Sequence, residues 1–296
     1  MATTTAARRP SGALALLQLM RPRLWSRNLL VAAVPLAAGA LLHREVLLAT
    51  LQAFVALCLA ASAGYCFNDV IDATADTRHP TKCSRPVASG RVSPGGAVTL
   101  CAVLAVAAMA VAWSASSLRW VVLGYLVLSV VYTTWLKREP VIELALVSAG
   151  FLLRAIAGGA ATAIAVSPWF LIVTGFGSLF VVTGKRLSEF VTSGPDRGTR
   201  RSLSGYTESY LRLVLGMAAA VTVAAYCLWA FGITSRRVET TYAALSVVPL
   251  VLGMMRYALD VDRGRAQEPE GVVSGDRVLQ GLGGLWLVIF WLAAMT

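Results

Sequence analysis

Charged residues are scarce in this chain of 296 residues, and that scarcity excludes a soluble globular protein. Only 14% of the residues are charged, whereas 57% are hydrophobic, and soluble domains rarely have this balance. Residues 46–66 and 211–229 are apolar for about 20 residues, the length that a helix needs to cross a bilayer. The sequence therefore predicts an all-α integral membrane protein.

The chain also lacks an ordered set of cysteines. Its five cysteines are scattered without CxxC spacing, and most of them fall in apolar segments. This distribution excludes a disulfide scaffold or a cysteine metal site and is typical of small core residues. The apolar run at 13–20 is short and no small-residue cleavage site follows it, so we expect no cleaved signal peptide.

Nine apolar segments are predicted to form a bundle of nine transmembrane helices. They cover residues 28–42, 46–66, 97–114, 120–136, 141–164, 167–184, 210–231, 241–256 and 278–295. A basic N-terminal segment, residues 1–27, precedes this single transmembrane domain, residues 28–296.

The basic residues predict how the bundle is oriented. One side collects the arginines of the N-terminal segment, Arg8 and Arg9 among them, together with the basic residues of 67–96, 137–138, 185–212 and 256–277. The other side holds only Arg44, Arg119, Arg236 and Arg237. The positive-inside rule then places the N-terminus and the long loops, including 185–209, in the cytoplasm of a cell-membrane protein. Because the +11 charge lies in these loops, membrane lipids and anionic substrates are the expected partners, not nucleic acid.

The end of the second segment carries the most informative motif. Asp69, Asp72 and Asp76 follow Asn68 at spacings that place the three aspartates on one face of a helix. Each repelling pair costs on the order of 3 kcal/mol at an effective dielectric near 20, so a cation must offset this charge. Hard oxygen ligands that leave room for phosphate suit Mg²⁺. The basic residues that follow, Arg78, Lys82 and Arg85, would hold phosphate oxygens.

Residues 68–76 match the N-D-x-x-D-x-x-x-D signature, and with nine segments the chain resembles the UbiA superfamily of intramembrane transferases. The resemblance implies a helical bundle with Asn68, Asp69, Asp72 and Asp76 in the catalytic set and the three aspartates as Mg²⁺ ligands. A second aspartate-rich motif usually follows the sixth segment in this superfamily. Here that position reads Gly-Lys-Arg-Leu-Ser-Glu, residues 184–189, which suits direct phosphate binding by Lys185 and Arg186 beside Glu189.

Within the superfamily, this combination is most similar to a branch that acts on a polyprenyl phosphate. The resemblance implies Mg²⁺-dependent transfer of 5-phosphoribosyl from phosphoribosyl pyrophosphate to a decaprenyl-type phosphate, as in arabinan and cell-wall precursor synthesis. The lipid phosphate is already anionic near pH 7, so the attack needs no general base. His79 is therefore either a phosphate contact or a plain loop residue.

Other candidate substrate-binding residues have a structural alternative. Arg154 lies within a membrane segment, where an unpaired charge is costly, so it either faces substrate or pairs with an acid. The arginines at 21–27 either bind the lipid phosphate or anchor the chain to anionic lipid, and the aromatics at 206 and 210 are also common at interfaces. The remaining candidates are Arg23, Arg27, Lys137, Tyr206, Tyr210 and Arg212.

Two other functions stay open at this point. The commoner UbiA activity, prenyl transfer from a polyprenyl diphosphate to an aromatic acceptor, predicts a second acidic motif that 184–189 does not supply. A transporter would show more ionisable groups near the midplane than Arg154 alone. The sequence leaves lipid chain length open, and a homo-oligomer is one of the open states of assembly.

Overall fold

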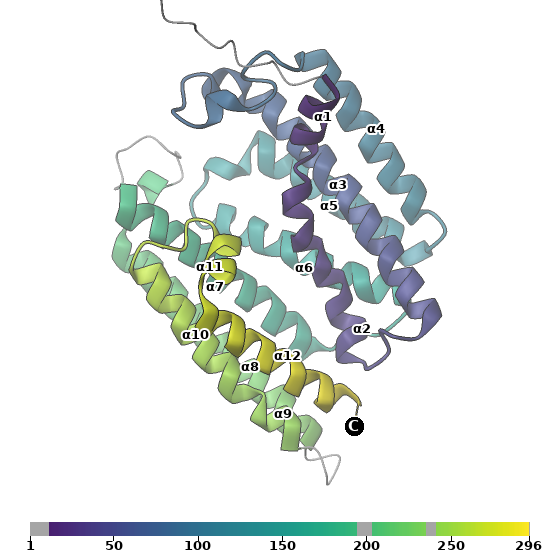
Figure 1. Cartoon of the computed structure of the whole chain (residues 1–296), viewed down its shortest axis with the longest axis vertical. Coiled ribbons are helices and arrows are strands. Elements are labelled where there is room, and N and C mark those ends of the chain that lie inside the picture. Colours follow the sequence, from purple (N-terminus) through teal and green to yellow (C-terminus); the bar gives the residue numbers. More distant parts are fainter. Residues whose placement is uncertain (1–11, 194–202, 235–240, 296) are drawn as a thin grey trace, which may run out of the picture.

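A computed structural model describes residues 12–193, 203–234 and 241–295, and every regular element within these ranges is a helix (Figure 1). The predicted loop positions Arg8, Arg9, Arg236 and Arg237, with part of the loop 185–209, lie outside the described residues. The elements are α1 (Gly12–Met20), η1 (Pro22–Ala32), α2 (Ala33–Ala37), α3 (Arg44–Asp76), η2 (Lys82–Ser84), α4 (Pro94–Ala112), α5 (Ser116–Thr134), η3 (Leu136–Arg138), α6 (Ile142–Thr162), α7 (Pro168–Ser193), η4 (Leu203–Gly205), α8 (Glu208–Thr234), α9 (Thr241–Leu245), α10 (Val247–Asp262), α11 (Pro269–Gly275) and α12 (Arg277–Met295).

Eight spans in the described ranges are long and apolar enough to cross a membrane. They are formed by α3, α4, α5, α6, α7, α8, α12 and the consecutive pair α9 and α10. Large apolar side chains such as Val106 and Trp120 are exposed on these helices, as expected where lipid tails replace water. The prediction of a multi-pass helical membrane protein is confirmed.

The first predicted segment, residues 28–42, is broken rather than one regular α-helix. Its chain runs through the 3₁₀ helix η1 and restarts as the short helix α2. Pro35 has no N–H to donate to the carbonyl of Val31, and it lies in the first turn of α2, where no such bond is required. Gly158 of α6 lies directly against that Val31 carbonyl, since a Cβ there would be 1.9 Å from the oxygen.

The helices form two groups with α6 and η1 between them. Figure 1 shows α3, α4 and α5 on one side and α7, α8, α10 and α12 on the other. One hydrophobic core joins α3, α4 and α5 to η1 and α6 through residues such as Leu57 and Leu118. A second core joins α6, α7, α8 and α10 around Leu144 and Leu211.

Two helices extend beyond the predicted membrane segments. The helix α3 continues from the predicted end at residue 66 to Asp76, and α7 continues from 184 to Ser193. Both motifs singled out in the sequence therefore lie on continuous helices. The apolar part of each helix therefore fixes the helical phase in which the side chains of its motif project.

Candidate active site

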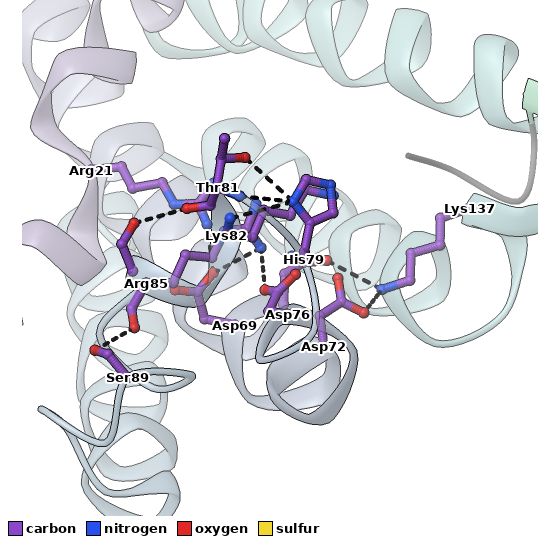
Figure 2. A network of polar contacts seen from close by, with 12 residues as sticks. Arg21, Asp69, Asp72, Asp76, His79, Thr81, Lys82, Arg85, Ser89 and Lys137 are labelled. Carbon is purple, nitrogen blue, oxygen red and sulfur yellow. Dashed lines mark hydrogen bonds and ion pairs between the residues drawn. The ribbon is translucent and has the colours of Figure 1, made fainter. Parts of the chain in front are cut away.

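The three motif aspartates share one face at the C-terminal end of α3. Because α3 stays helical through Asp76, the spacing brings Asp69, Asp72 and Asp76 together as predicted. Asp69 and Asp76 are buried, whereas the side chain of Asp72 is 26% exposed. Figure 2 shows basic side chains from other segments reaching all three.

Three cations from three different segments hold these carboxylates. Arg21 Nη2 lies 2.5 Å from Asp69 Oδ1, and Lys137 Nζ lies 2.5 Å from Asp72 Oδ1. Arg85 Nη1 lies 2.6 Å from Asp76 Oδ2 and 3.5 Å from Asp69 Oδ1. These ion pairs offset the repulsion expected among three carboxylates in one register.

All three cations differ from the sequence expectation. Arg85 and Lys137 were expected to bind substrate, but in this structure Arg85 bridges Asp69 and Asp76 and Lys137 pairs with Asp72. Arg21 belongs to the 21–27 cluster that was expected to bind the lipid phosphate or to anchor the chain, but it pairs with Asp69. Its guanidinium carbon also lies 5.3 Å from the centroid of the Tyr65 ring. The basic cluster at 21–27 was the available signal, but a contact with a residue 48 positions away cannot be read from local spacing.

The predicted Mg²⁺ ligands fit a metal ion by their chemistry. Asp69 Oδ2 is buried and has no hydrogen-bond partner, so it is an oxygen ligand left uncommitted by the protein. No set of three His, Cys, Asp or Glu side chains converges on one point within the described ranges. Mg²⁺ typically takes only one or two carboxylates together with phosphate oxygens of the substrate. These aspartates can supply the one or two carboxylates.

The loop after α3 is fixed by its own hydrogen bonds. Arg91 donates to Gln18 Oε1 at 2.6 Å and to the carbonyl of Ser84 at 2.5 Å, which ties the loop to α1. Ser89 donates to the carbonyl of Arg85 at 2.7 Å. Burial and, to a smaller extent, the positive charge of Lys82 lower the pKa of His79. The cations of this loop are thus presented by an ordered backbone.

The second motif forms a buried cluster of opposite charges. Arg186 is 3% exposed and is paired with Glu143, which is fully buried, and with Glu189 at 2.9 Å. Lys185 Nζ lies 4.0 Å from Glu189 Oε1. The sequence predicted that Arg186 binds phosphate, whereas the structure pairs it with Glu143 across α6 and α7. One acid that is remote in sequence, Glu143, and one on the same helix, Glu189, thus balance the two cations of α7.

A short segment connects the two clusters. In η3, Lys137 donates to Asp72 and lies 3.4 Å from Asn68 Oδ1. Three residues after η3, the backbone N–H of Val141 donates to the Tyr206 hydroxyl at 2.7 Å. Burial raises the pKa of Tyr206 to about 12, and its ring stacks on Tyr210 at 5.9 Å. The two tyrosines therefore brace the segment next to the site.

Arg154 has neutral partners. Its guanidinium donates to Asn28 Oδ1, the Gly150 carbonyl and the Tyr125 hydroxyl, each at 2.7 Å. The rings of Tyr125 and Phe151 lie 4.9 and 5.1 Å from its guanidinium carbon. Arg154 is buried, and within the described ranges its hydrogen-bond partners include no acid, so the acid partner considered from the sequence is not found there. Asn28, which was not among the residues selected from the sequence, is one of its three hydrogen-bond partners.

The remaining candidates lie around the site or away from it. Arg23 and Arg78 are exposed, and Arg27 and Lys82 are half-buried. Arg212 forms an exposed ion-pair cluster with Glu208 and Asp262, which is a surface role.

An apolar cavity opens between η1, α2, α7, α8 and α12. Its volume is about 360 Å³, within the range of ligand-sized pockets. Aromatic and aliphatic residues form its wall, the aromatic ones including Trp169, Trp229, Trp286 and Phe290. The Trp286 N–H donates to the Tyr226 hydroxyl at 2.9 Å. Because most of the lining side chains are apolar or aromatic, the cavity suits an apolar chain.

The helical bundle and the aspartate motif define an intramembrane transferase, and the chain belongs to the UbiA prenyltransferase family, whose model matches residues 28–274. The family predicted from the motifs is thereby confirmed. The chain is 44% identical to the decaprenyl-phosphate phosphoribosyltransferase of Mycobacterium tuberculosis (strain H37Rv), over 90% of each chain. It is 39% identical to the enzyme of the same name from Corynebacterium glutamicum, covering 92% of this chain and 84% of that one.

Solved structures share the fold at low sequence identity. A UbiA homolog from Archaeoglobus fulgidus bound to DMAPP and Mg²⁺ superposes with a TM-score of 0.73 at 16% identity, covering 95% of this chain and 99% of that one. The similarity in fold spans nearly the whole bundle.

Proposed function

We propose that this chain transfers a 5-phosphoribosyl group from phosphoribosyl pyrophosphate to a decaprenyl-type polyprenyl phosphate and releases pyrophosphate. The observation that carries the proposal is the aspartate face of α3, with Arg21, Arg85 and Lys137 gathered against it. The relatives that are 39–44% identical bear the matching name. The product would enter arabinan and cell-wall precursor synthesis.

The chemistry requires charge neutralisation and positioning. The bond between C1 of the ribose and the pyrophosphate oxygen breaks, and the electron pair leaves with pyrophosphate. An oxygen of the lipid phosphate forms the new bond to C1, and no proton has to be removed. Arg85 and Lys137 are placed to turn from carboxylate to phosphate oxygens and to stabilise the charge that develops on the leaving group.

The proposal includes a bound Mg²⁺ ion and a cytoplasmic position of the aspartate face. Asp69 and Asp72 would hold Mg²⁺, and Asp76 would complete the carboxylate set. When bound there, Mg²⁺ supplies charge stabilisation for the departing pyrophosphate. We place the aspartate face and its loops in the cytoplasm, because the donor is soluble and because the basic residues collect on that side. The apolar cavity near Trp286 is large enough for part of the lipid chain.

The test is a transfer assay with the purified chain in detergent or nanodiscs. Radiolabelled phosphoribosyl pyrophosphate, a decaprenyl phosphate and Mg²⁺ are incubated together, and the label that partitions into organic solvent is counted. We expect lipid-phase label that EDTA abolishes and that excess Mg²⁺ restores. The absence of label, together with transfer from a polyprenyl diphosphate to an aromatic acid, would overturn the proposal in favour of an ordinary prenyltransferase.

A further inference from the structure

His79 lies in the loop directly after the aspartate face, and its ring is fixed through one nitrogen. The backbone N–H groups of Thr81 and Lys82 point at Nδ1 from 3.3 and 3.4 Å, and the Thr81 hydroxyl lies 3.3 Å away. Figure 2 shows these contacts converging on the same side of the imidazole. The ring is thus oriented by the turn that follows it.

These contacts determine which nitrogen carries the proton. Two backbone donors directed at Nδ1 require this atom to accept, so the proton of the neutral ring is on Nε2. Within the described ranges, Nε2 makes no hydrogen bond to the protein, since the three contacts of the ring all go to Nδ1. His79 therefore presents an N–H donor whose direction is set by the loop backbone.

The surroundings indicate which ligand this donor meets. The backbone N–H of His79 donates to the backbone carbonyl of Asp76 at 3.1 Å, which places His79 one turn beyond the carboxylate face. The loop cations are next to it, and Arg85 is already engaged with two aspartates. A neutral N–H adds a phosphate contact without adding another positive charge to a region that already balances cations against carboxylates.

We propose that His79 binds the phosphoribosyl donor by donating a hydrogen bond from Nε2–H to a phosphate oxygen, either of its pyrophosphate or of its 5-phosphate. The loop is outside the membrane span that ends at Ile71, so a soluble ligand reaches it and a lipid phosphate approaches from the bilayer side. The inference rests on the proposed function for the identity of the donor, while the hydrogen bond is testable with phosphates alone.

Two matched variants separate ligand binding from a loop role. In His79→Asn, the side-chain Oδ1 can take the place of Nδ1 as acceptor for Thr81 and Lys82, but the distal donor is lost. In His79→Gln, the side-chain Nε2–H₂ reaches the position of the ring Nε2, but the acceptor near Cβ is lost. Binding of inorganic pyrophosphate with Mg²⁺, and separately of ribose 5-phosphate, is measured by calorimetry on the full chain in detergent.

We expect His79→Asn to weaken binding of one of these two phosphates about 10-fold, the effect of one lost hydrogen bond to a charged group. His79→Gln should stay within about 3-fold of the wild type. The affected ligand identifies which phosphate His79 contacts, and the KM for the lipid acceptor should not change. Wild-type binding of both phosphates by His79→Asn would overturn the inference. So would equal weakening in both variants with a lowered unfolding midpoint, since that marks a loop role.

The two proposals fail in different ways. If the wild type transfers no phosphoribosyl group but the Asn and Gln variants still differ in pyrophosphate binding, the histidine contact stands and the proposed reaction falls. If transfer occurs and the two variants bind both phosphates like the wild type, the reaction stands and the contact falls.

Discussion

The carboxylates of α3 are each neutralised by a residue that comes from elsewhere in the chain. The spacing of Asp69, Asp72 and Asp76 predicted their shared face, because helical periodicity alone decides it. The partners Arg21 and Lys137 depend on how η1 and η3 pack against α3, and local patterns carry no information about that packing. The acid half of the site was therefore predictable and the identity of its cations was not.

Asp72 is the aspartate best suited to a functional test, because its side chain is partly exposed. Among the described residues its ion-pair partner is Lys137, which also lies near Asn68. We expect Asp72→Asn to lower Mg²⁺-dependent transfer at least about 100-fold, since it removes the charge of a proposed metal ligand while keeping the shape of the side chain. The unfolding midpoint should stay close to that of the wild type. Asp262→Asn, which changes an exposed ion pair with Arg212, serves as the control and should keep full activity.

Retention of Mg²⁺-dependent activity in Asp72→Asn would remove this residue from the metal site. Loss of activity with a large drop in the unfolding midpoint would instead mean that the Asp72–Lys137 pair is chiefly structural.

Mutations of the neighbours Lys185 and Arg186 should affect different properties, substrate binding for Lys185 and stability for Arg186. Arg186→Met should destabilise the protein by about 3–5 kcal/mol, because Glu143 is left as an uncompensated buried charge. Adding Glu143→Leu should recover most of that loss. Lys185→Ala should leave the unfolding midpoint unchanged and raise the KM for one phosphate substrate, because Lys185 is half-buried at the edge of the cluster.

Thermal unfolding in detergent and steady-state kinetics decide between these roles. A stable Arg186→Met variant with a raised KM for a phosphate substrate would return Arg186 to the phosphate-binding role that the sequence suggested.

At the scale of elements, the contact between α6 and η1 depends on one glycine. A methyl group at Gly158 would overlap the Val31 carbonyl oxygen, and backbone atoms cannot move aside as a side chain does. We expect Gly158→Ala to destabilise the protein by about 1–3 kcal/mol or more. Gly175→Ala in α7 is the matched control, because a Cβ there meets no atom within 4 Å and the change should be neutral or stabilising by up to about 1 kcal/mol.

Thermal unfolding of both glycine variants provides the measurement. Equal midpoints for Gly158→Ala and Gly175→Ala would contradict the close approach of η1 to α6.

The elements were predictable where composition decides them. Apolar length identified the spans, since a helix must satisfy its own backbone in lipid, whereas the close contact between Gly158 and η1 depends on tertiary packing. The break in the first segment was not predicted. An apolar composition does not distinguish a 3₁₀ helix from an α-helix. Pro35 marks only the first turn of α2, where the chain becomes α-helical after η1.

At the scale of the whole molecule, one exposed cysteine tests the proposed orientation. Cys83 lies exposed in the loop after α3, whereas Cys58 and Cys66 are buried. A membrane-impermeant maleimide should label the chain in inverted membrane vesicles and leave it unlabelled in intact spheroplasts. The Cys83→Ser variant should lose that label, and Leu42→Cys in the same background should be labelled from the opposite side.

Labelling of Cys83 from outside intact cells would contradict the proposed orientation and place the loop after α3 outside the cytoplasm. It would also place the aspartate face away from a cytoplasmic pool of soluble donor.

The stretch from Lys137 to Glu143 makes contact with both charged clusters, because Lys137 reaches Asp72, Val141 reaches Tyr206 and Glu143 reaches Arg186. Val141 is held at φ 68°, which is unfavourable for a β-branched residue, so this stretch has little freedom to adjust between its contacts. We therefore expect a change at Tyr206 to shift the position of Lys137 through this stretch of backbone. A Tyr206 variant with an altered KM for phosphoribosyl pyrophosphate would thus report indirect coupling, and mutational maps of this enzyme will extend beyond the residues that its substrates touch.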